Sequence, residues 1–277
     1  MDSFHTEPCS DFKDFLLKVE EQKNKWWIYR GQQIDSWPLK HTFERACQRF
    51  GVKGNDRFKV ESNMIREFKR RIHHYISNIP LDDSTDEWMA LMQHHGAPTR
   101  LLDFTYSPYV ASYFAFESAT PNTKVAIWAV NAHWCKTHLE DISEILPEKY
   151  ERYRDNRKGK DFNDIFRQST PPKLLLAINP FRLNERLAYQ RGVFLCPGDV
   201  TTEFMDNLSF YTGYDQLDTK VIKYTIPTGR NNRNTINALD ELDLMNISRI
   251  TLFPGLDGFA QSFEPRTVSL FLKQSEH

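Results

Sequence analysis

The sequence predicts an α+β fold in one domain, with a helical N-terminal half and a mostly antiparallel sheet core. Helical apolar spacing dominates the first half, and three strand-like runs separated by turn residues follow in the second. The chain lacks the regular strand and helix alternation of a doubly wound sheet. Its 277 residues, 40% of them hydrophobic and 13% aromatic, fit a single domain with insertions and a sizeable core.

The first elements are a helix and a buried strand. Residues 1–25 contain the amphipathic run "SDFKDFLLKVEEQ", which predicts an N-terminal helix. The aromatic and β-branched run "KWWIYRGQQ" ends at Gly31 and predicts a strand. This strand would deliver Tyr29, Arg30 and Gln32 to its C-terminal edge. Residues 26–133 are expected to carry the functional motifs.

Three helices are predicted next. "VESNMIREFKRRIHHYI" keeps its apolar residues on one face. "STDEWMALMQHHG" opens with acidic residues that suit a helix N-terminus and closes at Gly96, a C-cap. "SPYVASYFAFE" begins with Ser107 as N-cap and Pro108 at the first helical position.

The rest of the chain divides into three parts. "KVAIWAVN" alternates as a strand does. Residues 134–171 are polar, charged and weakly periodic, which predicts a helical insertion or a mobile flap. Residues 172–277 contain the strand-like runs "KLLLAINP", "AYQRGVFLCPG" and "DTKVIKYTIP", followed by two helical segments that flank a "FPGLDG" loop.

Charge, cysteine spacing and hydropathy exclude several classes of protein. With 36 basic and 37 acidic residues the net charge is -1, so nucleic-acid binding would need a local patch. The four cysteines lie far apart, which argues against a structural zinc site and a disulfide framework. We expect a soluble, cytoplasmic protein without a membrane partner, because the N-terminus does not resemble a signal peptide and no apolar run approaches about 18 residues.

The stretch "QHHGAPTRLLDFT" concentrates polar residues just before the helix N-terminus at Ser107. Helix N-termini bind anions through their free amides and the helix dipole. With Arg30 nearby, Arg100 could complete a pair of guanidiniums that grips a pyrophosphate. The alternative is a structural ion pair between Arg100 and Asp103, which is the more common use of such residues.

The adjacent histidines of this stretch do not indicate a metal. His94 and His95 are too close along one helix to share an ion on one face, so a hydrogen bond to a ligand is the better role. The sequence also has no Gly-rich phosphate loop, no His-Glu-x-x-His and no Gly-x-Ser-x-Gly motif. Kinase, ATPase, serine hydrolase and zinc protease activities are therefore not favoured.

Two blocks resemble the signature of the FRG domain, which is named for a Phe-Arg-Gly triplet. They are "WWIYRGQ" at 26–32, with Tyr29 in place of the phenylalanine, and "WMALMQHHGAPTRLLDFTYSPYVASYFA" at 88–115. "ERLAYQRGVFLCPG" at 185–198 and "ITLFPGLDGFAQSF" near the C-terminus are also similar to the family. The resemblance implies one FRG domain over 1–277.

A more distant similarity is to the three-part plan of ADP-ribosyltransferases, and it implies their fold. By this resemblance Arg30 contacts the dinucleotide NAD, Thr105 and Ser107 occupy the second motif, and Gln190 begins the third. The position of the catalytic glutamate falls on Gly192. A carboxylate would then come from Asp103, our preferred substitute, or from Glu185.

The resemblance implies a mono-ADP-ribosyltransferase that uses NAD as substrate and modifies RNA, DNA or protein. Such an enzyme would be a bacterial toxin or anti-phage effector, with an antitoxin as a further partner. The alternative is a non-catalytic nucleotide- or partner-binding module on a degenerate transferase fold. The expected catalytic residues are Arg30, Asp103 and Gln190, without a metal. The expected NAD contacts are Tyr29, Gly31, Gln32, Gln93, His95, Thr99, Arg100, Leu101, Thr105 and Ser107.

Two basic runs could guide a polyanionic acceptor to this site. One is "REFKRR" at 66–71, and the other lies in the insertion, with Arg152, Arg154, Arg157, Lys158 and Lys160. Solvated helix faces explain the same charges.

Overall fold

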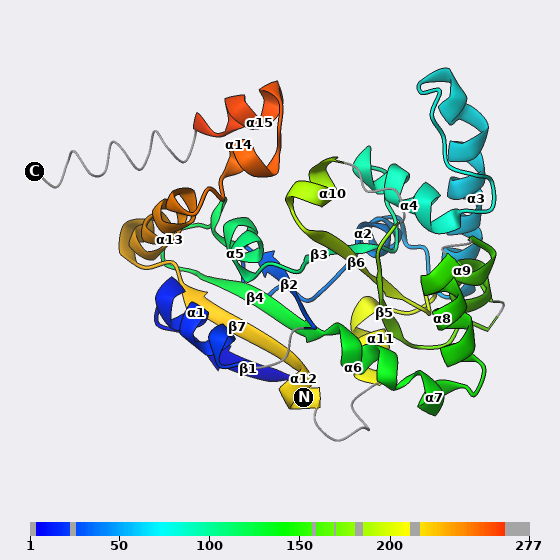
Figure 1. Cartoon of the computed structure of the whole chain (residues 1–277), viewed down its shortest axis with the longest axis horizontal. Helices are drawn as coiled ribbons and strands as arrows, with labels where there is room; N and C mark the ends of the chain where they lie inside the picture. The colour runs from blue at the N-terminus through cyan, green and yellow to red at the C-terminus, as the bar shows by residue number, and fades with distance from the viewer. Residues whose placement is uncertain are drawn as a thin grey trace, which may run out of the picture.

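The computed structural model describes residues 4–22, 26–156, 159–168, 170–180, 185–210 and 217–263. Its centre is a seven-stranded sheet of order β1-β7-β4-β2-β3-β6-β5, in which only the β1–β7 pair is parallel (Figure 1). The strands are β1 His5–Pro8, β2 Trp27–Gln32, β3 Leu102–Thr105, β4 Lys124–Asn131, β5 Leu175–Ile178, β6 Gly192–Pro197 and β7 Val221–Pro227.

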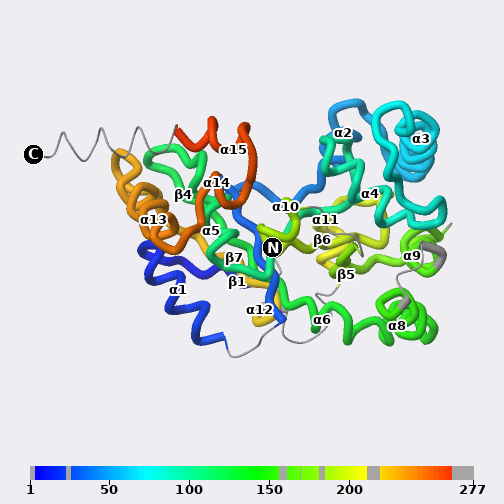
Figure 2. The backbone as a smooth tube through the Cα atoms, turned by 45° about the horizontal axis from the view of Figure 1, so that its top comes forward, coloured from blue at the N-terminus to red at the C-terminus, as the bar shows by residue number. Residues whose placement is uncertain are grey.

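Helices cover both faces of the sheet (Figure 2). They are α1 Phe12–Glu20, α2 Thr42–Phe50, α3 Asn55–Arg71, α4 Thr85–His94, α5 Pro108–Phe116, α6 Ala132–Thr137, α7 Leu139–Ile142, α8 Leu146–Asn156, α9 Gly159–Phe166, α10 Glu185–Tyr189, α11 Phe204–Ser209, α12 Leu217–Lys220, α13 Arg233–Leu244, α14 Arg249–Leu252 and α15 Leu256–Gln261. Short 3-10 turns lie at Ile72–His74 and Arg230–Asn232.

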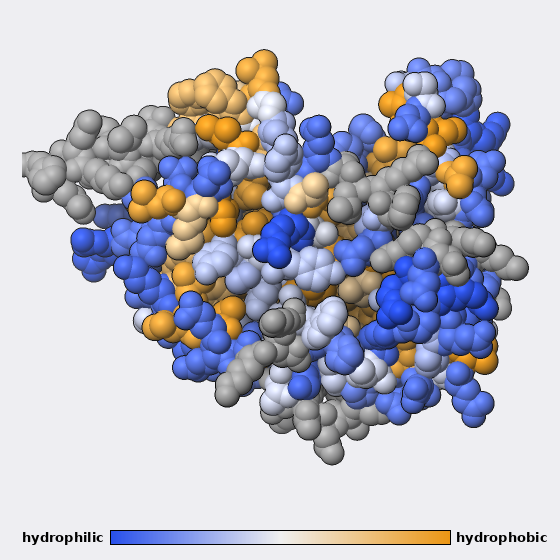
Figure 3. Space-filling model, viewed as in Figure 1, coloured by the Kyte–Doolittle hydropathy of each residue, from blue (hydrophilic) through white to orange (hydrophobic). Residues whose placement is uncertain are grey.

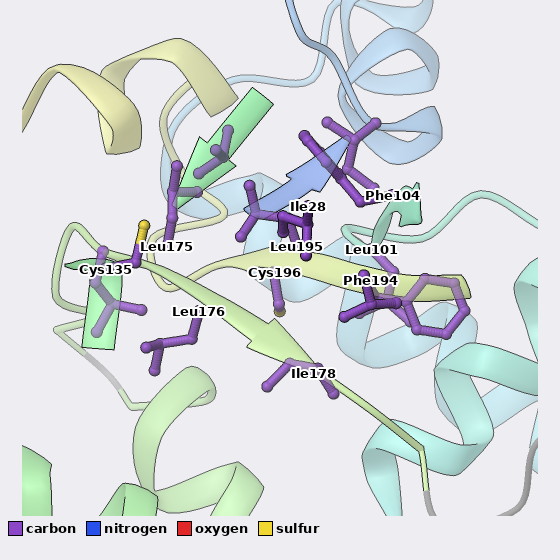
Figure 4. Close-up of a cluster of buried hydrophobic side chains, with 14 of the residues drawn as sticks. Ile28, Leu101, Phe104, Cys135, Leu175, Leu176, Ile178, Phe194, Leu195 and Cys196 are labelled. Atoms are coloured by element: carbon purple, nitrogen blue, oxygen red, sulfur yellow. The ribbon is translucent and has the colours of Figure 1, made fainter. Parts of the chain in front are cut away.

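Two hydrophobic clusters fill the two faces. One packs α1, α5 and α13 against β2, β4 and β7. The other fills the space between the opposite face, with β3, β5 and β6, and the helices α4, α6, α8, α9 and α11. Figure 4 shows part of this second cluster, where Ile28, Phe104, Phe194 and Leu175 come from four strands. Burial of this apolar surface is the main favourable contribution to folding.

The mixture of helices and strands and the mostly antiparallel sheet are confirmed, but the expected order, with the strands mostly in the second half, is wrong. β1, β2, β3 and β4 all lie before residue 132. β1, "HTEP", and β3, "LDFT", have four residues each and no extended apolar alternation. They are strands because β7 and β6 pair with them, and such partners cannot be read from local periodicity.

The 134–171 segment is a helical cover of the core, as far as its described residues show. It forms α6 to α9, and the side chains of Tyr153, Phe162 and Phe166 are fully buried. The alternative of a mobile flap is therefore wrong for this part, because these aromatic residues belong to the main cluster. Residues 157, 158 and 169 lie outside the described ranges.

Gly31 lets α5 approach β2 closely. A Cβ atom at this position would lie 2.0 Å from the main-chain oxygen of Ala111 and 2.5 Å from the main-chain nitrogen of Ala115. Only glycine fits such a contact without movement of the helix. The helix itself begins as predicted, since Ser107 Oγ accepts a hydrogen bond from the Val110 amide (3.3 Å) and Pro108 occupies the first turn.

Across the described ranges, no helix combines the length and apolar character needed to cross a membrane. The four cysteines are buried and unpaired. No group of three or more potential metal ligands occurs in this part of the chain.

Candidate functional site

The candidate site lies where the sheet opens between β2 and β3. β2 pairs with β4 along its whole length, but its register with β3 is limited to the Tyr29–Thr105 pair. A cavity of about 230 Å³ lies at this opening. Its lining residues are Tyr29, Arg30, Gly31, Asp103, Phe104, Thr105, Ala111, Phe114, Arg186 and Gln190.

The guanidinium of Arg30 is held in this cavity by a hydrogen bond to the main chain. Its Nη1 donates a hydrogen bond to the main-chain oxygen of Asp103 (2.7 Å), a carbonyl that lies where the two strands have separated. Its Nε is buried and has no hydrogen-bond partner within the described ranges. Burial lowers the pKa of Arg30; the charge of Asp103 opposes this and that of Arg45 adds to it. A buried guanidinium nitrogen without a partner is uncommon in folded proteins.

The Asp103 carboxylate is exposed, and a hydrogen bond from a neighbouring side chain fixes its orientation. Its Oδ1 accepts a hydrogen bond from Gln93 Nε2 (2.8 Å). Gln93 Oε1 accepts one in turn from the Thr99 hydroxyl, and the Thr99 amide donates to Thr42 Oγ1 (3.0 Å). The polar loop after α4 therefore fixes the carboxylate through Gln93.

Thr105 connects the second and third sequence blocks. Its Oγ1 donates to the main-chain oxygen of Gln190 (2.7 Å) and accepts from the Ser107 amide (3.0 Å). Gln190 is held from the other side, because its Nε2 donates to the main-chain oxygen of Leu252 (3.1 Å). The segment before β6 is thus attached both to β3 and to the C-terminal helices.

These contacts bring together most of the predicted site. Tyr29, Arg30, Gly31, Asp103, Thr105 and Gln190 all line the cavity. Gln93 and Thr99 stand one and two hydrogen bonds behind Asp103. Ser107 acts as the N-cap of α5.

Arg100 does not belong to this cavity, so a pyrophosphate grip by two guanidiniums, Arg30 and Arg100, is wrong. Its side chain is fully buried and its Nε donates to Glu61 Oε1 (2.7 Å). Nη1 donates to the main-chain oxygens of Phe166 (2.9 Å) and Gly198 (3.0 Å). The alternative of an Arg100–Asp103 ion pair is wrong as well, because the partner is Glu61, 39 residues earlier in the chain.

Three other expected NAD contacts do not line this cavity, although Gln32 lines a neighbouring cavity together with Arg30 and Gly31. Gln32 is buried, with its Oε1 accepting from Trp128 Nε1 (2.7 Å) and its Nε2 donating to the main-chain oxygen of Pro38. Leu101 is a core residue. His95 is exposed and packs edge-on against His94, with ring centroids 4.9 Å apart. Neither Leu101 nor His95 lines the cavity.

Arg186 lines the cavity and was not predicted. It lies on α10, with its guanidinium carbon 4.7 Å from the ring centroid of Phe253. Its neighbour Glu185, the second candidate carboxylate, lines an adjacent cavity instead. Arg186 stands four residues before Gln190 in the third sequence block, and this closeness in the sequence could have indicated that it lies at the site.

The expected glutamate position, Gly192, lies under the side chain of Leu187. A Cβ atom on Gly192 would lie 2.4 Å from Leu187 Cδ2. The main-chain atoms of Leu187 are farther away, at 3.4 and 3.5 Å, so a side chain at this position would displace the end of the Leu187 side chain. Among the described residues that line the cavity, Asp103 is the one with a carboxylate.

The two basic runs lie on solvated helices rather than at the site. In "REFKRR" Glu67 accepts hydrogen bonds from Arg70 (2.8 Å) and Arg71 (3.1 Å), and the end of α3 projects from the body (Figure 1). In the insertion Arg152 pairs with Asp161 (2.7 Å). Arg154 pairs with Asp155 (3.1 Å). Arg157, Lys158 and the side chain of Lys160 lie outside the described part of the chain.

Residues 25–124 match the family model of the FRG domain. The match supports the FRG family for this chain and covers both sequence blocks that carry Arg30 and Asp103. Arg186 and Gln190, which complete the cavity, lie beyond the matched FRG segment. No curated protein and no solved structure matches the chain.

Proposed function

We propose that this FRG-domain protein is a mono-ADP-ribosyltransferase that uses NAD as substrate and modifies a macromolecule. The observation that carries the proposal is the convergence of Arg30, Thr105 and Gln190 on one cavity, together with the carboxylate of Asp103. These residues come from three separate sequence blocks. The order of the blocks is the one that is similar to the transferase plan.

The residues fit a dinucleotide in their donor chemistry. Arg30 offers a buried Nε without a protein partner in the described ranges, which suits a phosphate or carboxamide oxygen. Tyr29 and Phe114 provide aromatic walls for a nicotinamide ring. A cavity of about 230 Å³ takes only part of a dinucleotide. Neighbouring cavities of about 580 Å³ and 570 Å³ share Arg30 and Arg186 with it and extend the groove.

The reaction that we propose is a substitution at the anomeric carbon of the nicotinamide ribose. The bond from this carbon to the nicotinamide nitrogen breaks, and nicotinamide leaves with the electron pair. A nucleophilic oxygen or nitrogen of the acceptor forms the new bond and gives up its proton. Asp103 would stabilise the positive charge that develops on the ribose and accept this proton, while Gln93 keeps the carboxylate oriented.

The acceptor approaches from the surface beside α10. In Figure 3 this face is hollowed between the lobe of α14 and α15 and the projecting end of α3, and α10 lies between them in Figure 1. The cavity at this position contains His94, Glu185, Arg186, Arg249 and Asp257. Because this cavity has both acidic and basic side chains, the acceptor that we propose is a macromolecule of any of three classes, RNA, DNA or protein. We further propose that the protein is a bacterial toxin or anti-phage effector, with an antitoxin as a partner.

One observation favours a second function, a nucleotide-binding module without catalysis. The position of the transferase glutamate is Gly192, which carries no carboxylate, and the end of the Leu187 side chain lies over it. Asp103 must then replace the glutamate from a different strand. If Asp103 only orients the loop, the cavity binds a nucleotide and does not cleave it.

The test is incubation of the full chain with radiolabelled NAD and a cell lysate, with nucleic acid and protein fractions resolved separately. We expect Asp103→Asn to reduce label transfer by at least about 100-fold, the effect of removing one transition-state electrostatic contact. Asp56→Asn is the matched control, because Asp56 is an exposed carboxylate on α3 that pairs with Lys59. Wild-type protein that binds NAD but neither cleaves nor transfers it would contradict the transferase and favour the binding module.

A further inference from the structure

A second cavity lies on the other side of Arg30. Its volume is about 580 Å³, and it is bounded by the end of β2, the following loop and α2. Three cations line it, Arg30, Lys40 and Arg45, and no carboxylate is among its lining residues in the described chain. Two carboxylates lie behind its wall, because Gln48 donates hydrogen bonds to Glu203 (2.9 Å) and to Glu44 (3.5 Å).

Neutral oxygen atoms of the protein accept the hydrogen bonds of two of these cations. Arg45 Nη1 donates to the main-chain oxygen of Lys40 (2.7 Å), and Lys40 Nζ donates to Gln48 Oε1 (3.1 Å). Arg45 lies close enough to Arg30 for its charge to lower the pKa of Arg30, although burial is the larger cause. Like charges that face one cavity repel each other, and a bound anion relieves this repulsion.

Trp37 gives the same cavity an aromatic wall. Its side chain is 47% exposed, although a tryptophan side chain of this size is usually well covered. It follows β2 in the loop that leads to Pro38, and both residues line the cavity. An exposed indole beside a cluster of cations is the combination that binds a nucleotide base and its phosphates.

We propose that this cavity binds the adenosine diphosphate half of the dinucleotide, with Arg30, Lys40 and Arg45 on the diphosphate and Trp37 on the adenine. The inference rests on the proposed function and extends it to the part of the substrate that does not react. Arg30 lies in both cavities, so it joins the diphosphate to the site of bond cleavage.

The experiment uses ADP as probe, because ADP carries the base and the diphosphate but has no glycosidic bond to nicotinamide. Its affinity for the full chain is measured by isothermal titration calorimetry. Arg45→Gln should weaken ADP binding by about 10- to 100-fold, the loss expected for one charge-assisted hydrogen bond. Trp37→Leu should weaken the binding of both ADP and adenosine, since it removes the stacking surface rather than a charge.

Arg49→Gln is the matched control. Arg49 is an exposed arginine on the same helix, with its guanidinium carbon 4.7 Å from the ring centroid of Phe50, and it does not line the cavity. Circular dichroism and thermal unfolding establish that each variant is folded. Equal ADP affinity in Arg45→Gln and Arg49→Gln overturns the proposal. A wild-type protein that does not bind ADP also overturns it. The same holds if the wild-type protein binds a single-stranded oligonucleotide that adenine does not displace.

The two proposals fail in different ways. ADP binding that depends on Arg45, combined with NAD that stays intact, supports this subsite and contradicts the transferase. NAD transfer that proceeds with an unchanged KM in Arg45→Gln contradicts the subsite and leaves the transferase standing.

Discussion

His41 is a buried histidine whose two ring nitrogens are used unequally. Nδ1 accepts a hydrogen bond from the Glu44 amide (3.0 Å) and caps α2, whereas Nε2 is buried without a hydrogen-bond partner in the described ranges and lies 3.9 Å from Glu44 Oε2. Burial, with the positive charges of Arg100, Arg57 and Arg45, lowers the pKa of His41 to about 3. The ring is therefore neutral in the folded protein.

This neutral histidine makes stability depend on pH. Between pH 6.5 and about 3 the unfolded chain binds a proton at His41 that the folded protein does not, so stability falls as pH falls through this window. From pH 7.5 to 5.0 the loss from this group is about 2 kcal/mol. Urea unfolding at both pH values should therefore show a smaller loss for His41→Asn, whose amide oxygen can still cap α2. An identical loss in both proteins would contradict the buried neutral state.

Single residues of the site could be predicted where they stood in recognisable blocks. Arg30, Thr105 and Gln190 were placed by the order of the blocks, and they meet at one cavity. Arg100 could not be assigned correctly, because its partner Glu61 is brought to it only by the packing of α3. Arg45 stands outside every block, so its electrostatic effect on the pKa of Arg30 could be recognised only from the structure.

At the level of elements, the contact between β2 and α5 depends on the absence of a side chain. The missing Cβ of Gly31 leaves room for the main chain of Ala111 and Ala115. Because both neighbours are backbone atoms of a helix, they cannot move like the end of a flexible side chain. A methyl group at Gly31 must displace the helix or the strand.

We expect Gly31→Ala to lower the free energy of unfolding by about 3 kcal/mol or more, the upper range for overpacking. Gly96→Ala is the comparison, because Gly96 has φ of 82° but open space around its Cβ position. Its cost should be only the left-handed backbone penalty of about 1 to 2 kcal/mol. Urea denaturation measures both. Equal losses would mean that crowding against α5 is not the reason for a glycine at Gly31.

The predictability of the elements follows their length and pattern. β2, β4, β6, β7 and α3 carry long apolar signals and were predicted, as was the Ser107 cap of α5. β1 and β3 were not predicted as elements, because four polar or mixed residues give no periodicity. The limited pairing of β2 with β3, which opens the site, has no sequence signal at all.

Across the whole molecule, Arg100 joins elements that are distant in the sequence. Its guanidinium binds Glu61 on α3, the end of α9 at Phe166 and the end of β6 at Gly198. Arg167 shares the same carboxylate, with Nη1 3.3 Å from Glu61 Oε2. This buried charge network connects the helical cover to the sheet.

Arg100→Met should therefore destabilise the protein by about 3 to 5 kcal/mol, the usual cost of leaving a buried charge without its partner. The free energy of unfolding in urea is the measurement. Arg49→Met serves as control, because Arg49 is exposed and takes no part in the network. A loss below about 1 kcal/mol for Arg100→Met would indicate that Arg167 alone compensates Glu61.

The limited pairing of β2 with β3 also bears on how this architecture can be inherited. The matched segment 25–124 holds both strands, but their other partner strands, β4 with β2 and β6 with β3, lie at or beyond its end. Cut out or transplanted alone, the segment would keep a single strand-to-strand register pair and lose one wall of its cavity. The segment that matches the family model therefore depends on the downstream half of the chain for the completion of its sheet.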